Sequence, residues 1–362
     1  MTTRQASHGA RSPMRTRLGL RFLMSRGPWG TSSAVVSLLP RPRIVRSASR
    51  TQASLNVLGR ECSADTSAVR RPASELRLAR PLDGGSFEQV AGAFLGEREA
   101  ENCVMLGLCS SMRAGATSIQ SFTPYFGVVR SRDAVVGAAL IAGYLVLLSS
   151  PIEDAALPLL VADIARAAPD VPGVVAEVSA SRRFAELWTA STARSHRLHL
   201  SERIFRLEHV IPPPPVDGEM RVATEADHRL LAEWLAEFNA EALGQTADGA
   251  AMDAFAARWI ARQGRTMYLW VAAGRPVSMV GVSGETPHGI RVAPVYTPRA
   301  LRGRGYASAL TATATQQQLQ SGKRYCFLFT DLANPTSNHI YRAIGYQPVS
   351  DVADYRFEPP GG

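Results

Sequence analysis

The sequence predicts a mixed α/β fold made of two similar domains in tandem, each with a central, mostly antiparallel sheet flanked by helices. Three observations predict it. The chain has 362 residues, 46% hydrophobic and 20% charged, which is typical of a soluble globular protein and long enough for about two domains. Four consecutive prolines at 212–215 form a stiff boundary. The segments on either side of them show the same order of expected strands and helices.

Residues 1–80 are expected to form a disordered basic arm, because they show no sustained strand or helix periodicity. The net charge of +9 comes from this arm: residues 1–60 contain eleven Arg and no acidic residue, which leaves about −2 for the remainder. The arm resembles an organelle transit peptide, is compatible with a nucleic-acid-binding tail, and also fits sequence translated upstream of the true start codon. Only Lys323 among the 40 basic residues is not Arg, as in a GC-rich genome, so a nucleic-acid partner is not expected.

Cysteine usage and hydropathy predict a cytoplasmic protein that does not span a membrane. The four cysteines, Cys62, Cys103, Cys109 and Cys326, form no CxxC pair and are too few for a disulfide framework, which indicates a reducing compartment. The longest apolar run, Ala134–Leu148, contains two glycines and many β-branched residues. Buried strands explain this run better than a membrane helix, which needs about 20 residues. The sequence does not define the oligomeric state and is compatible with a monomer.

The linker is expected at 211–218 and the second domain at 219–358. Thr224 is a good N-cap, Leu231, Leu235 and Phe238 recur at helical spacing after it, and Gly274-Arg275 suits a hairpin turn. The expected elements are a strand at 220–223, helices at 224–243 and 250–263, strands at 266–273, 276–283 and 290–297, a helix at 305–320, a strand at 325–330, a helix at 334–344 and a strand at 346–357.

The first domain is expected at 82–210 with the same order of elements. These are helical segments around 85–99, two or three strands within 124–149, a helix at 152–168, a strand at 174–179, a helix at 182–195 and a strand at 199–209. The matching order indicates a structural duplication, although the two halves share no obvious sequence identity.

A glycine-rich segment, 295–307, leaves an expected strand and opens an expected helix. Backbone N–H groups in such a turn lack partners within the chain, and the helix N-terminus adds partial positive charge, so the turn can hold an anionic phosphate. Arg302 and Arg304 could add charge at its rim. The pattern R-x-x-G-x-G/A is short enough to arise by chance, and a plain loop with solvated arginines would give the same sequence.

A dinucleotide-binding fingerprint is a competing interpretation of this loop, because Asp331 ends the next strand as a ribose-binding acid would. Two features disfavour it. Ser308 stands where the fingerprint has its third small Gly or Ala. The preceding strands also come as hairpins, which a doubly wound parallel sheet does not use.

The second half resembles the GCN5-related N-acetyltransferase (GNAT) family over about 219–358. Arg302, Gly303, Arg304, Gly305, Tyr306 and Ala307 match the R-x-x-G-x-G/A motif after a strand. A second motif follows in order: Asn334 after the next strand, then Tyr341-Arg-Ala-Ile-Gly345-Tyr346, which has the family spacing. The resemblance implies acetyl-CoA as co-substrate, with its pyrophosphate held by the backbone from about Leu301 to Ala307.

The resemblance extends to tandem-domain bacterial members in which a degenerate first copy precedes an active second copy. In the first half, Ser150-Pro151-Ile152-Glu153-Asp154 follows the corresponding strand, with no glycine and two acids where phosphates would lie. Carboxylates suit a helix N-terminus and repel CoA, so no cofactor is expected there.

The family resemblance assigns Tyr341 as the general acid that protonates the leaving CoA thiolate. The alternative is that its ring only packs under the sheet. A backbone N–H near Val295 or Tyr296 is the expected oxyanion donor, and Thr297 is the next expected cofactor contact. Asn334 and Asn338 are further candidates for contact with CoA, although Asn334 before Pro335 is also a good helix N-cap.

The base that deprotonates the acceptor amine is assigned to Glu285, with His288 and Asp331 as weaker candidates. All three lie near expected strand ends, and 283–289 also has the composition of a plain hairpin loop. A water chain could replace a base. The histidines lack metal-ligand spacing, so no metal is expected.

The sequence therefore predicts an N-acetyltransferase that acts on a small-molecule amine or a peptide N-terminus. Two alternatives remain. One is transfer of a larger acyl or an aminoacyl group, and the other is a non-catalytic CoA-binding regulatory protein. Retention of both the loop and Tyr341 favours an enzyme.

Overall fold

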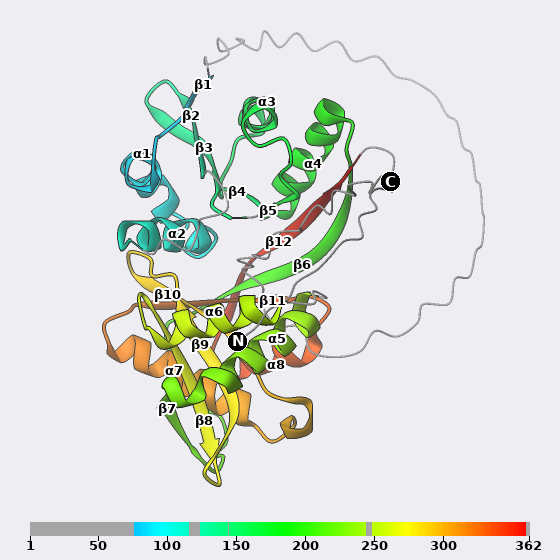
Figure 1. Ribbon diagram of the computed structural model, residues 1–362. Coiled ribbons are helices and arrows are strands. Elements are labelled where there is room, and N and C mark those ends of the chain that lie inside the picture. Colours follow the sequence, from blue (N-terminus) through cyan, green and yellow to red (C-terminus); the bar gives the residue numbers. More distant parts are fainter. Residues whose placement is uncertain (1–75, 116–123, 144, 244–247, 360–362) are drawn as a thin grey trace, which may run out of the picture.

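The computed structural model describes residues 76–115, 124–143, 145–243 and 248–359. Twelve strands form one continuous sheet in the order β1-β2-β3-β4-β5-β12-β6-β11-β10-β9-β8-β7. Helices cover both faces of this sheet (Figure 1). The predicted mixed α/β architecture with a mostly antiparallel sheet flanked by helices is confirmed.

The first half begins earlier than expected, because the strand β1 lies inside the segment assigned to the arm. Residues 1–75 of that arm, including Cys62, lie outside the described residues. The elements are β1 (Leu76–Ala79), α1 (Gly84–Gly96), α2 (Cys103–Arg113), β2 (Tyr125–Ser131), β3 (Ala134–Ile141), β4 (Val146–Leu148), the 3₁₀ turn η1 (Asp154–Ala156), α3 (Leu157–Ala167), β5 (Gly173–Glu177), α4 (Val178–Thr192) and β6 (Ser195–Leu207).

The second half follows the expected order closely. Its elements are β7 (Glu219–Val222), η2 (Glu225–Asp227), α5 (His228–Leu243), α6 (Gly249–Ile260), β8 (Arg265–Ala272), β9 (Arg275–Ser283), β10 (Gly289–Tyr296), η3 (Arg299–Leu301), α7 (Tyr306–Gln320), β11 (Tyr325–Asp331), α8 (Pro335–Ala343) and β12 (Gln347–Glu358). Thr224 caps the turn before α5, as its position predicted.

The two halves exchange their last strands, which the sequence did not predict. β12, from the second half, lies between β5 and β6 of the first. β6, from the first half, lies between β12 and β11 of the second. These two long antiparallel strands run side by side between the halves (Figure 1). The halves are therefore joined by backbone hydrogen bonds and not only by the linker.

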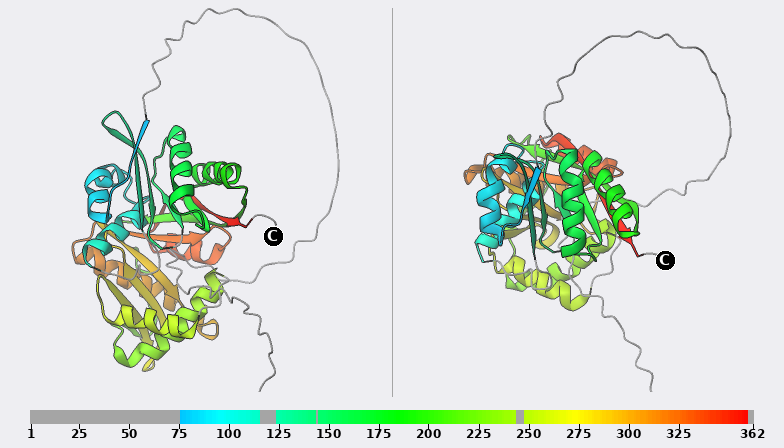
Figure 2. Two further views of the ribbon diagram at one scale, coloured as in Figure 1. Left: turned by 45° about the horizontal axis from the view of Figure 1, so that its top comes forward. Right: turned by 90° about the horizontal axis from the view of Figure 1, so that it is seen from above.

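The two faces of the sheet carry different helices, as the views in Figure 2 show for α1 and α2 against α3 and α4. On the second half, the Trp259 indole of α6 covers Gly281 of β9 on one face. Gln318 of α7 donates a hydrogen bond to Tyr268 on the other face. A buried cluster joins Cys103 of α2 to Phe327 and Phe329 of β11, so α2 lies on the α6 face.

The apolar run predicted to be strands forms β3 and β4, and its side chains are mostly buried. None of the described helices combines the length and apolar character needed to cross a bilayer. Cys103, Cys109 and Cys326 are buried free thiols, and burial raises the pKa of each to about 12.

Candidate functional site

β10 and β11 are parallel neighbours that pair over only three positions, from Gly289 with Tyr325 to Arg291 with Phe327. Beyond these pairs β10 continues to Tyr296 and β11 to Asp331 without further pairing. The register of β10 against β9 also shifts between Val292 and Val295. The two strands thus diverge toward their carboxyl ends, at the part of β10 where the oxyanion donor is expected.

The loop that follows β10 has the backbone of an anion site. Gly303 and Gly305 adopt φ angles of +76° and +81°, which L side chains rarely adopt. A Cβ at Gly303 would meet no atom within 4 Å, so the backbone there faces open space. Within the described part of the chain, no hydrogen bond occupies the N–H groups from Gly303 to Ala307. These N–H groups at the start of α7 fit a pyrophosphate.

The two arginines of the loop differ in their surroundings. Arg302 donates from Nε to the Thr297 carbonyl at 2.8 Å and from a terminal nitrogen to Glu241 at 2.8 Å. Glu241 also binds Arg299 at 3.0 Å. Arg302 therefore braces the loop against α5, whereas Arg304 is exposed and free to meet an anion.

Tyr341 is 2% exposed and its ring packs edge-on against Tyr346, with centroids 6.0 Å apart. Burial raises the pKa of the Tyr341 phenol well above its usual 10. The Tyr346 hydroxyl forms a hydrogen bond with the Thr315 hydroxyl at 2.8 Å. The Tyr341 hydroxyl makes no hydrogen bond with any residue that the structure describes, so it is available to a ligand.

The two asparagines of the second motif form hydrogen bonds that stabilise the start of α8. The Asn334 side chain caps α8 by accepting from the Ser337 N–H at 3.1 Å. Asn338 donates to the carbonyls of Asp331 and Asn334 at 2.9 and 2.7 Å. Its Oδ1 is buried and has no partner among the described residues, which leaves one acceptor at the start of α8.

Two acids of α5 near the cleft were missed by the sequence analysis. Tyr296, at the end of β10, donates its hydroxyl to Glu237 at 2.7 Å. Burial and this carboxylate raise the pKa of Tyr296 well above 10. Glu237 and Glu241 are one helical turn apart, and both face the open end of β10. On a sequence alone, such acids are indistinguishable from the solvated face of a helix.

The remaining cofactor candidates line the same end of β10 and the start of α7. Val295 and Thr297 are buried, and the Thr297 hydroxyl bonds Ser278 at 2.8 Å, so their side chains belong to the packing and only their backbone faces the cleft. Tyr306 and Ala307 are half-buried in the first turn of α7.

The three base candidates are all engaged in loop structure. Glu285 forms an ion pair with Lys323. The His288 ring lies 2.8 Å from Glu99 of the first half. Asp331 accepts from the Ala333 N–H at 2.8 Å. Glu285 and His288 lie at the end of β10 where the strands are paired, away from the diverging end.

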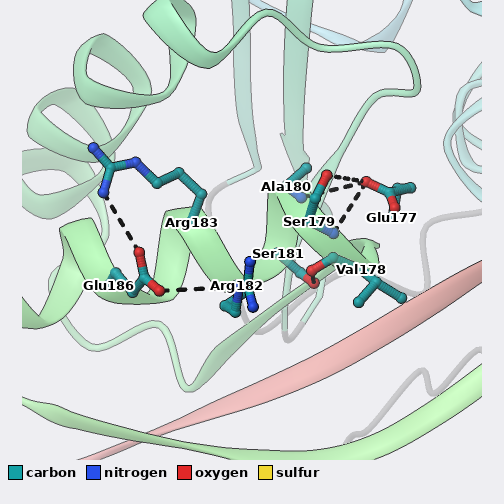
Figure 3. Close-up of polar contacts among 8 residues, drawn as sticks. All are labelled: Glu177, Val178, Ser179, Ala180, Ser181, Arg182, Arg183 and Glu186. Carbon is teal, nitrogen blue, oxygen red and sulfur yellow. Dashed lines mark hydrogen bonds and ion pairs between the residues drawn. The ribbon is translucent and has the colours of Figure 1, made fainter. Parts of the chain in front are cut away.

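The corresponding positions of the first half are filled by the chain itself. The Ser150 N–H, after β4, donates to Asn102 at 2.9 Å, and Ser149 is likewise bonded to Ala138. At the start of α4, Glu177 accepts from the N–H groups of Ser179 and Ala180 (Figure 3). These N–H groups of the first half are therefore bonded within the chain and are not available to a phosphate.

Metal ligands were not expected, and within the described ranges no group of three or more His, Cys, Asp or Glu side chains could hold an ion.

Comparisons with known proteins agree with this geometry. Residues 229–346 match the family described as "Acetyltransferase (GNAT) family". No curated protein sequence matches the chain significantly.

A solved tandem GNAT protein from the clavulanic acid biosynthesis pathway is 15% identical, with a TM-score of 0.51 over 80% of this chain and 99% of its own. A Drosophila protein is 12% identical, with a TM-score of 0.56 over 78% of this chain and 99% of its own. A GCN5-related N-acetyltransferase from Sphaerobacter thermophilus is 17% identical, with a TM-score of 0.50 over 78% and 95%. The chain therefore has the fold of GNAT acyltransferases, in its tandem form.

Proposed function

Because residues 229–346 match the acetyltransferase (GNAT) family, we propose that the second half transfers an acetyl group from acetyl-CoA to a primary amine on a small molecule or a peptide. The observation that carries this proposal is the divergence of β10 from β11 just after Arg291, with the unpartnered N–H groups of the glycine loop at its open end. In this arrangement the loop N–H groups would bind the phosphates of acetyl-CoA, and its thioester would lie between the diverging strands.

In this proposal the amine nitrogen attacks the thioester carbonyl, the new C–N bond forms, and the C–S bond breaks with its electron pair leaving on sulfur. Tyr341 donates its hydroxyl proton to that thiolate and is reprotonated by water. Support comes from the Tyr341 hydroxyl, which has no partner among the described residues, and from its raised pKa, which keeps it protonated. A backbone N–H near Val295 or Tyr296 would stabilise the oxyanion.

The proton lost by the amine goes to water in this proposal. Glu285, the candidate base from the sequence, is paired with Lys323 at the paired end of β10. A water chain from the cleft needs no such side chain. We therefore expect Glu285→Gln to retain most of the activity.

Thiol release from acetyl-CoA, measured against a panel of primary amines, amino acids and peptides, tests the proposal. Amine-dependent release supports it. Release that occurs only with a longer acyl-CoA or an aminoacyl donor would move the assignment to that kind of transferase. Calorimetric binding of acetyl-CoA without turnover on any acceptor would instead indicate a CoA-binding regulatory protein.

A further inference from the structure

Two arginines lie in one row across three neighbouring strands of the second half. Arg265 of β8 pairs with Ser283 of β9, and Ser283 pairs with Arg291 of β10. Residues directly opposite one another in a sheet project from the same face. With strands about 4.8 Å apart, two side chains as long as Arg reach a common point above Ser283.

This row lies where the cleft between β10 and β11 opens. Arg291 is the last residue of β10 that pairs with β11, and the strands diverge after it. Its partner Phe327 lies in the cluster under α2, so the row is on the α6 face. Tyr341 is linked through Tyr346 and Thr315 to α7, on the opposite face. A thioester between the strands would meet Tyr341 from one face and the arginines from the other.

A tryptophan of α6 holds the Arg265 guanidinium in place, and a third arginine, Arg258, is stacked beside it. Arg265 lies over the Trp259 ring at 5.6 Å, and Arg258 lies over the Phe255 ring at 5.1 Å. The end of the Trp259 indole lies close to Gly281, next to the Ala293–Pro294 backbone in the shifted part of β10. The cationic site is thus adjacent to the backbone where the acyl group is expected.

The site brings several hydrogen-bond donors together. Trp259 is 3% exposed, and its indole N–H is buried with no partner in the part of the chain that the structure describes. No ion pair joins Arg265 to a described acid. Burial lowers the pKa of Arg265, and the charges of Arg258 and Arg291 lower it further. Glu202 offsets part of the Arg291 charge. An anion would relieve both the repulsion and the unpaired N–H.

We propose that the acceptor amine also carries an oxyanion group, a carboxylate or a phosphate, which Arg265 and Arg291 bind on the α6 face while the amine reaches the thioester beside Val292. This inference rests on the proposed function and narrows its substrate class. The Arg-rich composition of the chain does not by itself explain why these two arginines lie together. A chain with 40 basic residues has many arginines, whereas these two are half-buried and share one row of the sheet, and Arg265 also lies over the Trp259 ring.

Two matched pairs of amines test the proposal: L-alanine against L-alaninamide, and phosphoethanolamine against ethanolamine. In each pair only the first amine carries an oxyanion group. The first pair tests for a carboxylate and the second for a phosphate. Arg265→Gln is expected to lower kcat/KM for the favoured anionic amine about 10- to 100-fold, the effect of losing a charge-assisted hydrogen bond. The value for its neutral partner and the KM for acetyl-CoA should stay nearly unchanged. Because amine basicity differs within a pair, each ratio is compared between wild type and variant.

Two further variants serve as controls. Arg265→Lys keeps the charge and should restore part of the preference. Arg275→Gln removes an exposed arginine at the other end of the same hairpin and should leave the preference unchanged. Equal kcat/KM values for both members of both pairs, with normal acetyl-CoA turnover, would overturn the inference and leave the proposed function standing.

Binding measured without turnover separates the two ideas if no acetyl transfer is found. The full chain is titrated calorimetrically with N-acetyl-L-alanine and with its amide. Tighter binding of the carboxylate that Arg265→Gln abolishes would support the anion site even though the proposed function fails. No preference for the carboxylate in this case would overturn the anion site as well.

Discussion

The Glu99 carboxylate of the first half accepts from both the backbone N–H and the imidazole of His288 in the second half, each at 2.8 Å. It also accepts from the Thr286 hydroxyl. Glu99 is thus buried by a loop of the other half and organises that loop. His288, a candidate base by sequence, takes part in the contact between the halves.

Glu99→Ala is expected to lower the free energy of unfolding by about 1–3 kcal/mol, because the Thr286 hydroxyl and the His288 N–H lose their charged acceptor. Urea unfolding at constant pH measures the change. Glu97→Ala removes an exposed acid two residues before Glu99; it is the control and should change stability by no more than about 0.5 kcal/mol. An equal effect of both variants would show that the contact contributes nothing specific.

Outside the paired strands, Gly107 of α2 packs closely against the backbone of the second half. A Cβ there would lie 2.8 Å from the Gly284 Cα and 3.0 Å from its carbonyl, and neither backbone atom can move aside cheaply. Gly107→Ala should therefore destabilise the protein by about 1–3 kcal/mol despite the higher helix propensity of Ala.

Gly96→Ala is the matched control for Gly107→Ala, because a Cβ at the end of α1 meets nothing within 4 Å. It should raise stability by about 0.4–1 kcal/mol by restricting the unfolded chain. A Tm shift of the same sign for both variants would contradict the close approach of the two halves.

Tyr341→Phe is expected to lower kcat at least tenfold with little change in the KM for acetyl-CoA, since only the hydroxyl is lost. Burial raises the phenol pKa above its usual 10, so the acid form persists to higher pH than for a free tyrosine. The wild-type kcat should therefore show no decline from tyrosine ionisation up to about pH 10. A Tyr341→Phe variant with wild-type kcat would remove the general-acid role.

Gly303→Ala is expected to weaken acetyl-CoA binding at least tenfold, because its Cβ would occupy the open space above the loop and the backbone has a positive φ. Gly322→Ala is the control: Gly322 has a φ of +98° and equally open surroundings, but it follows the far end of α7. Both variants carry similar backbone strain, so calorimetry should show a loss of affinity only for Gly303→Ala. Equal losses would place the phosphates elsewhere.

Local signals predicted most elements of the second half to within a few residues. The hairpin that joins the strands at 266–273 and 276–283 and the cap at Thr224 depend on neighbours in sequence, and both are found. β1 was missed because Leu76–Ala79 is too short to establish a period. The helical segments expected around 85–99 are the helices α1 and α2, and α2 extends beyond the expected range. In the turn between them, Asn102 bonds the Ser150 backbone.

The exchange of β6 and β12 was beyond sequence reasoning, because alternation shows that a strand has two faces but not which neighbour it pairs with. The residues of the candidate site also fall into a part that the sequence predicts and a part that it does not. The glycine loop and Tyr341 follow from motif spacing. The roles of Glu237 and Glu99 depend on partners far away in the chain, and the row of Arg265 and Arg291 depends on strand register.

The position of β12 has a consequence for how the protein folds during synthesis. Glu177 of β5 pairs with Val352, near the end of the chain, so the sheet of the first half has an unfilled place until the last strand leaves the ribosome. Contacts of such long sequence separation slow folding, and unpaired strand edges meanwhile invite pairing with other chains. We therefore expect the nascent first half to bind chaperones, and the twelve residues of β12 to complete both halves in one step.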